Sequence, residues 1–390
     1  MTKTAHRAGA AILLSLALTG LACTSGQPGD VAVAAARSAA TPGPSGTAWA
    51  RLADRVRTPV LHWTTCRKTA QCATARLPLN YHQPHGATVQ VALLRIRAKD
   101  PRHRLGTIFV NPGGPGDSAR DFAYSVQLPP ALPKRILDRF DIVGADPRGV
   151  GGSTPVQCFT TAAQRARTEA PLRAVPFPVT PAQQRAWIGA ARALGRACSS
   201  TGRPVAAAMS TTDDALDMDV LRRAVGDRKL TYVGVSYGSY LGLVYANMFP
   251  GRVRAMVIDG IVDPQTLAGT RATAGVPVFD RMGSAAASDR ALHELLELCQ
   301  RAGRSRCSFA TAHTQARFGQ LAARLRVHPL RLAAPGVTAV TFAYPDLIAD
   351  TEHWLHDPSG YRGLFPELTG LARLTAPGGA GRGRAAVVRA

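Results

Sequence analysis

The 390-residue sequence contains only five lysines, and it has neither an H-E-x-x-H zinc motif nor a Gly-Lys-Ser/Thr phosphate-loop ending. Aromatic residues make up 6% of the chain and are not interleaved with a basic stripe, although arginine raises the formal net charge to +22. Nucleic-acid binding normally requires basic residues gathered on one face. Scattered arginines with abundant alanine, glycine and proline instead indicate a GC-rich coding sequence. We therefore expect no nucleic-acid partner, no metal and no cofactor.

Long apolar runs are also scarce, and the one clear example spans residues 8–22 after two basic residues. The run is too short for a comfortable membrane span and is typical of a secretory signal peptide. We expect a signal peptide over residues 1–30 and a flexible linker over residues 31–48. Cys23 follows "GLA", so a membrane-anchored lipoprotein with a lipid at Cys23 is an alternative to ordinary cleavage near "VAVAAA". Either route predicts a secreted or extracellular protein without a membrane span.

Cysteine usage agrees with export. Besides Cys23, the chain has an even set of six cysteines, namely Cys66, Cys72, Cys158, Cys198, Cys299 and Cys307. None belongs to a metal-type CxxC with a matching second pair, and disulfides are the usual state in an oxidising compartment. Pairing neighbours in sequence order closes the shortest loops. Buried free thiols are the alternative.

Short apolar runs alternate with helical patterns, as in a mainly parallel sheet with crossover helices. The predicted strands are residues 88–98, 106–111, 140–146, 229–235 and 253–260, and the predicted helices are residues 210–226, 239–249, 288–302 and 314–327. The strand rhythm fades from about residue 266 onward. We predict a core over residues 49–265, a helical cap over residues 266–370 inserted after the strand that ends near Asp259, and a low-complexity tail over residues 371–390.

The stretch Gly234-Val-Ser236-Tyr-Gly238 fits G-x-S-x-G, with a predicted strand before it and a predicted helix after it. In that context the motif predicts a nucleophile elbow, a sharp turn that exposes the serine hydroxyl. The helix that follows would direct free N–H groups at a developing oxyanion. A chance occurrence of the motif is the alternative.

A second glycine-rich turn, "NPGGPG" at residues 111–116, follows the predicted strand upstream. This is where the same fold supplies the other half of its oxyanion hole. Gly113 and Gly114 would offer backbone N–H groups, and the Tyr237 N–H would be the second donor. A plain structural turn is the alternative.

Four segments in this order, "NPGGPG", "DPRGVGGS", "GVSYGSYLGLVYANMFP" and "VIDGIVDP", resemble the exported α/β-hydrolase aminopeptidases of actinobacteria. This is the tripeptidyl aminopeptidase group, which is related to prolyl iminopeptidases, and the resemblance covers about residues 49–365. It implies a Ser-Asp-His triad that acts on peptides with a free amino end. Carried over by position, it implies a nucleophile (Ser236), two oxyanion donors (Gly114 and Tyr237) and a loop beside the site (Asp146, Arg148 and Gly149).

The triad partners of Ser236 do not follow the family pattern. The last histidine is His356 and the last acidic residue is Glu367, so no Gly-His or Asp-x-x-Thr-Pro-like segment occurs near the end. Asp259 is a candidate acid at a strand end, although such residues more often cap a turn. The later histidines (His293, His313, His328, His353 and His356) fit surface or cap positions, so the catalytic histidine is unknown. We expect that the final strands and helix of the fold are absent because the chain is truncated.

The leading interpretation is a secreted serine hydrolase that cleaves peptide bonds near a free N-terminus through an acyl-enzyme on Ser236. An esterase of the same fold is the alternative, because the elbow and oxyanion hole serve esters equally well. A third possibility from a different class is an inactive homologue, or a binding protein, that lacks the triad acid and histidine. The oligomeric state has no signal in the sequence.

Overall fold

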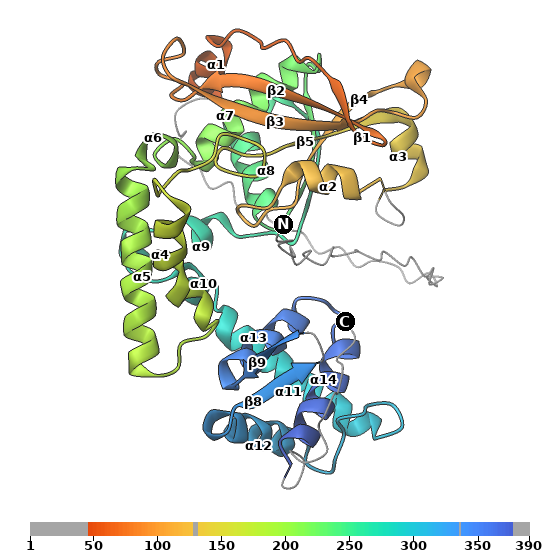
Figure 1. Cartoon of the computed structure of the whole chain (residues 1–390). Helices are drawn as coiled ribbons and strands as arrows, with labels where there is room; N and C mark the ends of the chain where they lie inside the picture. Colours follow the sequence, from red (N-terminus) through yellow and green to blue (C-terminus); the bar gives the residue numbers. More distant parts are fainter. Residues whose placement is uncertain (1–45, 128–131, 335–336, 377–390) are drawn as a thin grey trace. The chain divides into compact units, whose positions relative to one another are not determined.

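The computed structural model describes residues 46–127, 132–334 and 337–376, and the chain divides into two compact units (Figure 1). The first unit contains the described residues up to 157 together with residues 198–263. The second contains residues 158–197 together with the described residues from 264 onward. Residues 158–197, which lie inside the predicted core segment, thus group with the second unit. The predicted signal peptide, Cys23 and most of the predicted linker and tail lie outside the described residues.

The first unit is built on a seven-stranded sheet with the order β1-β2-β3-β5-β4-β6-β7. Pairings from β1 to β5 along this order are antiparallel, and those from β5 to β7 are parallel. The strands are β1 (Thr64–Arg67), β2 (Ala70–Pro78), β3 (Thr88–Ile96), β4 (Gly106–Asn111), β5 (Phe140–Ala145), β6 (Leu230–Val235) and β7 (Val253–Asp259). The five predicted strands are confirmed, whereas β1 and β2 were not predicted.

Helices cover both faces of this sheet, which explains why every residue of β4 is buried. One core cluster joins the sheet to α1 (Gly46–Asp54), α7 (Thr211–Ala224) and α8 (Tyr237–Met248). The other joins it to α2 (Ala119–Ser125) and α3 (Lys134–Arg139). A short helix, α6 (Arg203–Ala206), precedes α7. The predicted helices at α7 and α8 are confirmed.

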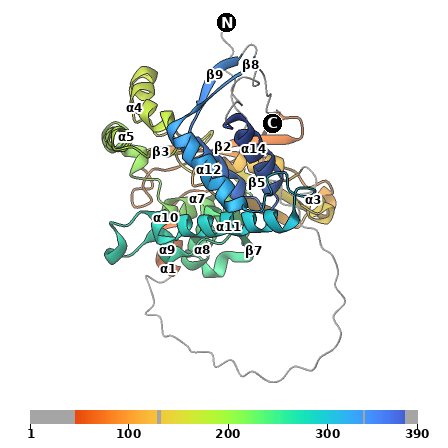
Figure 2. The same ribbon diagram turned by 90° about the horizontal axis from the view of Figure 1, so that it is seen from below.

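The second unit is mainly helical. Its elements are α4 (Ala162–Ala174), α5 (Pro181–Ser200), α9 (Pro264–Ala268), α10 (Val278–Arg281), α11 (Ser284–Ala302), α12 (Thr314–Val327), β8 (Leu330–Ala334), β9 (Val337–Phe342), α13 (Tyr344–Leu355) and α14 (Tyr361–Leu374). Figure 2 shows α12 crossing α11, two helices that pack together. The helical patterns at α11 and α12 are confirmed. The β8–β9 hairpin was not predicted, because its strands are short and directly follow a segment with the hydrophobic periodicity of a helix.

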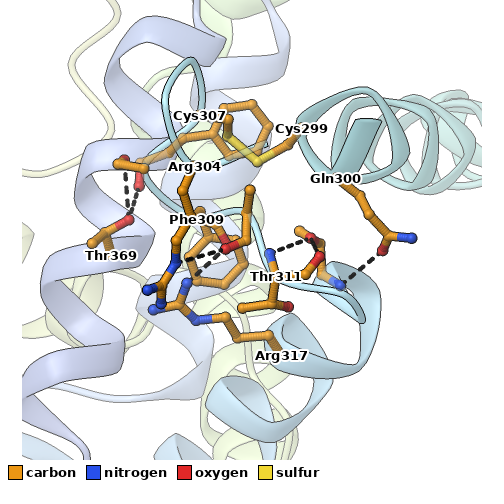
Figure 3. Close-up of a disulfide and its surroundings, with 12 residues drawn as sticks. Cys299, Gln300, Arg304, Cys307, Phe309, Thr311, Arg317 and Thr369 are labelled. Carbon is orange, nitrogen blue, oxygen red and sulfur yellow. Dashed lines mark hydrogen bonds between the residues drawn. A yellow bond between two sulfur atoms is a disulfide. The ribbon is translucent and has the colours of Figure 1, made fainter. Parts of the chain in front are cut away.

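Two of the predicted disulfides are present, Cys66–Cys72 in the first unit and Cys299–Cys307 in the second. Cys158 and Cys198 are each disulfide-bonded as well. Figure 3 shows the bond that joins the end of α11 to the loop before α12, beside the buried ring of Phe309. None of the described helices combines the length and apolar character that a membrane span requires.

Candidate active site

Ser236 lies on the sharp turn between β6 and α8, with its side chain exposed to solvent. Its φ of 55° and ψ of −125° make it the one non-glycine residue with positive φ among the described residues. Holding a serine in this region costs on the order of 1–3 kcal/mol, and such strain is typical of functional sites. The turn is held by the Ser236 N–H, which donates to the Asp259 carbonyl at 2.9 Å. The backbone therefore has the geometry of a nucleophile elbow.

The glycine-rich loop after β4 packs directly against this elbow. A side chain at Gly113 would place its Cβ 2.6 Å from the Val235 carbonyl and 2.7 Å from the Tyr237 nitrogen. A side chain at Gly238 would lie 2.5 Å from the Asn111 carbonyl. Distances below 3 Å are not tolerated by a real Cβ, so glycine is required on both sides of the contact. The two motifs that the sequence analysis singled out are thus brought together by close backbone approach.

Two backbone donors at this contact make no hydrogen bond within the described part of the chain. Tyr237 is the first residue of α8, where helical N–H groups lack intrahelical partners. The N–H of Gly114 is likewise without a partner among the described residues. Asn111 Oδ1 accepts the Gly113 N–H at 2.9 Å and so holds the loop in shape. Free N–H groups beside a serine suit an oxyanion, and the roles of Gly114 and Tyr237 stay predictions.

Asp146, at the end of β5, ties together the segments that flank the loop. Its carboxylate is buried and accepts hydrogen bonds from the Ser118 hydroxyl at 2.8 Å and from the Arg120 N–H at 3.1 Å. It also accepts the Gly152 N–H at 2.9 Å. Gly149 has a φ of 79° and forms a bridge with Pro155. These contacts place Asp146 and Gly149 in the framework beside the site.

Arg148 is fully buried, and every N–H of its guanidinium is used by the protein. It donates to Asp217 at 2.7 and 2.8 Å. It also donates to the carbonyls of Leu79 at 2.8 Å, Pro78 at 2.7 Å and Ala208 at 2.8 Å. Burial by itself would lower the pKa of Arg148, but the charge and hydrogen bonds of Asp217, with smaller contributions from Tyr81 and Asp213, hold that pKa above its ordinary value. Arg148 therefore acts as an internal clamp that has no donor left for a substrate.

The burial of three acids in α7 was not predicted from the sequence. Ser210 and Asp213 form the capping box at its start, as a helix with these residues in its first turn predicts. Asp214, Asp217 and Asp219, however, are buried inside the first unit. The sequence signal for this burial was the number of aspartates in "TTDDALDMD", which exceeds what is needed to stabilise the N-terminus of a helix.

A small cavity of about 30 Å³ lies behind the elbow, lined in part by Asn111, Asp214 and Tyr232. Oδ1 of Asp214 is buried without a hydrogen-bond partner in the described part of the chain. Burial, followed by the charge of Asp217, raises the pKa of Asp214 to about 8. The space suits about one water molecule. Asp214 is thus a neutral acid at pH 7 within the support of the elbow.

The candidate acid Asp259 lies at the exposed end of β7. Its Oδ1 accepts the N–H of Gly260 at 2.8 Å, so the side chain caps the turn that follows the strand. Its main-chain carbonyl is the group that holds Ser236. A catalytic role for the Asp259 carboxylate stays a prediction.

The later histidines all lie in the second unit. The ring of His293 is 2.8 Å from the Asp289 carbonyl, and the ring of His356 is 2.8 Å from the Glu352 carbonyl, which is local bonding within a helix. Within the first unit, the Ser236 hydroxyl forms no hydrogen bond with a described residue. The described part of the chain also contains no group of three side chains suited to a metal ion.

Comparison with known proteins agrees with this geometry. Residues 106–296 match the family model for the alpha/beta hydrolase fold. The chain is an α/β-hydrolase-fold protein. It is 37% identical over 211 residues to a tripeptidyl aminopeptidase of Streptomyces coelicolor, and 38% identical over 226 residues to the serine protease Hip1 of Mycobacterium tuberculosis. It is also 33% identical over 329 residues to a carboxylesterase B of Mycobacterium tuberculosis.

These alignments cover different shares of each protein. They take in 52%, 55% and 81% of this chain, respectively, and 38%, 42% and 59% of the three relatives. The alignments therefore cover less than two thirds of the length of each of these relatives. The family resemblance seen in the four sequence motifs is confirmed at the level of fold and of serine-peptidase relatives.

Proposed function

We propose that this chain is an exported serine hydrolase that cleaves peptide bonds near a free N-terminus through an acyl-enzyme on Ser236. The observation that carries the proposal is the strained, exposed Ser236 beside two backbone N–H groups without partners in the described structure. The relatives named tripeptidyl aminopeptidase and serine protease support the peptide substrate. Two disulfides and the predicted signal peptide support export. An exported protein held at the membrane by a lipid on Cys23 is the alternative to a freely secreted one.

In the proposed reaction, Ser236 Oγ forms a bond to the substrate carbonyl carbon and transfers its proton to a general base. The carbonyl electron pair moves to the oxygen, which the N–H groups of Tyr237 and Gly114 would stabilise. Collapse of this intermediate breaks the C–N bond as the protonated base gives its proton to the leaving nitrogen, which releases the amine and leaves an acyl ester on Ser236. Water then attacks the ester and releases the N-terminal fragment. No described residue is bonded to Ser236 Oγ, so the general base is not assigned to a residue.

A fluorophosphonate probe tests for an assembled site. We expect stoichiometric labelling of the full chain that Ser236→Ala abolishes. Ser125→Ala is the matched control, because the Ser125 hydroxyl only bonds the Phe122 carbonyl within its own helix. Absence of labelling in the folded protein would instead assign the chain to inactive homologues, because loss of the base leaves only the residual rate of the oxyanion hole.

The substrate class is tested on protein that reacts with the fluorophosphonate probe. Tripeptidyl amides with a free amine should be cleaved, and the same peptides with an acetylated N-terminus should not. Ester hydrolysis is the second candidate function, supported by the carboxylesterase B relative that aligns with most of this chain. Cleavage of simple esters without any peptidyl amide would favour it over the aminopeptidase.

A further inference from the structure

A polar hollow of about 430 Å³ lies on the β1–β2–β3 part of the sheet in the first unit. Its floor consists of small side chains, because Thr64 is paired with Cys72 in register and Thr74 is paired with Ala92. Cross-strand partners point to the same face of the sheet, so the side chains of these two pairs, which are all small, lie together at the base of the hollow. The residues around it are His62, Thr64, Cys72, Ala73, Thr74, Ala92, Arg120 and Gly152.

The guanidinium of Arg120 is the charged group in this hollow. Arg120 comes from α2, which packs against β3 and β5 (Figure 1), and its side chain is only 22% exposed. Nη1 forms an ion pair with the buried Asp146 carboxylate at 3.7 Å, too long for a hydrogen bond, and Nη2 donates to the weak acceptor Cys72 Sγ at 3.5 Å. Nε is buried without a partner in the described part of the chain. Unlike Arg148, Arg120 therefore keeps N–H donors that the protein does not use.

The remaining polar side chains of the hollow are also free to bond a ligand. The hydroxyls of Thr64 and Thr74 and the ring of His62 have no hydrogen bond to any described residue, and all three are exposed. No carboxylate is among the lining residues. A fork of N–H donors with nearby hydroxyls matches an oxyanion better than a cation or an apolar group.

We propose that this hollow binds a small oxyanion, a carboxylate or phosphate group, on the guanidinium of Arg120 with Thr64 and Thr74 as supporting donors. A volume of about 430 Å³ falls within the range of small-molecule sites. The inference is independent of the proposed function, since it needs neither Ser236 nor a catalytic base. It assigns a ligand to the N–H groups of Arg120 that form no hydrogen bond to an oxygen acceptor in the described structure.

The test is a titration of the full chain with inorganic phosphate and, separately, with succinate, at constant ionic strength balanced with sodium chloride. Calorimetry gives the affinity, and the thermal unfolding midpoint gives an independent reading. We expect a saturable response to at least one anion, weakened at least about tenfold in Arg120→Met because charge-assisted hydrogen bonds are lost. Phosphate alone would identify a tetrahedral anion, and succinate alone a carboxylate.

Arg97→Met is the matched control, because it removes the same charge from an exposed position just after β3 that does not line the hollow. Its affinity should stay within about twofold of the parent chain. If Arg120→Met does not fold, Thr74→Val, which removes a hydroxyl but keeps the shape, should still weaken binding by about threefold or more. No saturable binding, or an equal loss in Arg97→Met, overturns the proposal.

Discussion

The two units of this chain stabilise their interiors with different chemistry. In the first unit, Arg148 and the aspartates Asp214, Asp217 and Asp219 are buried beneath the sheet and the elbow. In the second, the corresponding interior is a cluster of leucine and phenylalanine side chains, for example Leu325 and Phe309, beside the Cys299–Cys307 bond. The first interior adds a network of buried charges to its apolar clusters, whereas the second consists of apolar packing beside a covalent link.

The buried charges of the first unit and the apolar interior of the second differ in how strictly they fix the geometry of their surroundings. Hydrogen-bonded charges are costly to bury, but they allow few alternative arrangements when every member is satisfied. The network of Arg148 and Asp217 ties α7 to the end of β2, while the Asp259 carbonyl holds the strained turn and Asn111 Oδ1 holds the glycine-rich loop. Apolar packing is less directional, and it is sufficient for a helical cluster such as the one that includes α11, α12 and α14.

The largest expected effect comes from breaking the charge network. Arg148→Met removes the donor to three carbonyls and leaves the buried Asp217 carboxylate with the Tyr81 hydroxyl in place of a cation, so we expect a loss of about 3–5 kcal/mol in unfolding free energy. Hydrogen exchange followed by mass spectrometry should show this loss in α7 and no change in α14. Arg76→Met, an exposed arginine of β2, should change stability by no more than about 0.5 kcal/mol. Equal deprotection of both units would contradict the comparison.

Asp214, the buried acid near Arg148 and Asp217, should make the stability of the first unit depend on pH. The charged groups near the Asp214 carboxyl are Asp213, Asp217 and Arg148. The charge of Asp214 in turn contributes to the raised pKa values of Tyr232 and Tyr237. The pKa of Asp214 is about 8 in the folded chain and near 3.8 ordinarily, so folding takes up a proton between these values. Stability should therefore fall as pH rises from about 4 to about 8, by about 1.4 kcal/mol per pH unit from this group.

Asp214→Asn keeps the shape of the neutral acid and cannot ionise. Chemical denaturation at pH 5 and pH 7 should show the parent chain losing about 3 kcal/mol more than the variant over this interval. Asp138→Asn, at a largely surface ion pair of α3, serves as the control and should follow the parent. Parallel pH curves for the parent and Asp214→Asn would show that Asp214 is ionised in the folded state.

In the second unit, the matching experiment is removal of the disulfide. The double variant Cys299→Ser/Cys307→Ser opens a loop with a sequence separation of 8, which should cost about 2–3 kcal/mol. Hydrogen exchange should increase in α11 and α14 and stay unchanged in α7. The double variant Cys66→Ser/Cys72→Ser is the control for cysteine chemistry in the first unit. An effect of Cys299→Ser/Cys307→Ser on α7 would show that the two interiors are not independent.

The smallest expected effect is on the strained turn itself. Ser236→Gly should be more stable than Ser236→Ala by about 1 kcal/mol, because glycine adopts a φ of 55° without the clash of a Cβ. Both variants should lose fluorophosphonate labelling. Thermal unfolding compares the two, and equal midpoints would mean that the turn stores no strain.

Much of the first unit could be predicted from local pattern. The strands β3 to β7 are short apolar runs bounded by turn residues, and α7 starts with Ser210 and acidic residues in its first turn. β1 and β2 escaped prediction because they are polar or interrupted, and they pair in an antiparallel arrangement at the edge of the sheet. The β8–β9 hairpin escaped for a similar reason, since its short strands occur within a helical segment.

The candidate site divides in the same way. The elbow could be recognised from Gly234, Ser236 and Gly238, because a sharp turn with close backbone approach restricts the residues that can form it. The partners of Arg148 could not be read in advance, since Asp217 lies 69 residues away along the chain. Asp214 looked like an ordinary residue in the first turn of a helix, and only its burial revealed a neutral acid.

By itself the sequence determined where the elbow and the glycine-rich loop occur, because steric limits on the backbone act between neighbouring residues. Tertiary structure decided that these two turns touch, that the acids of α7 are buried, and that Arg120 faces a hollow with spare donors. Those outcomes depend on which side chains from distant segments meet and on which polar groups are left without partners. Burial and hydrogen-bond satisfaction are properties of the assembled fold, and no local pattern records them.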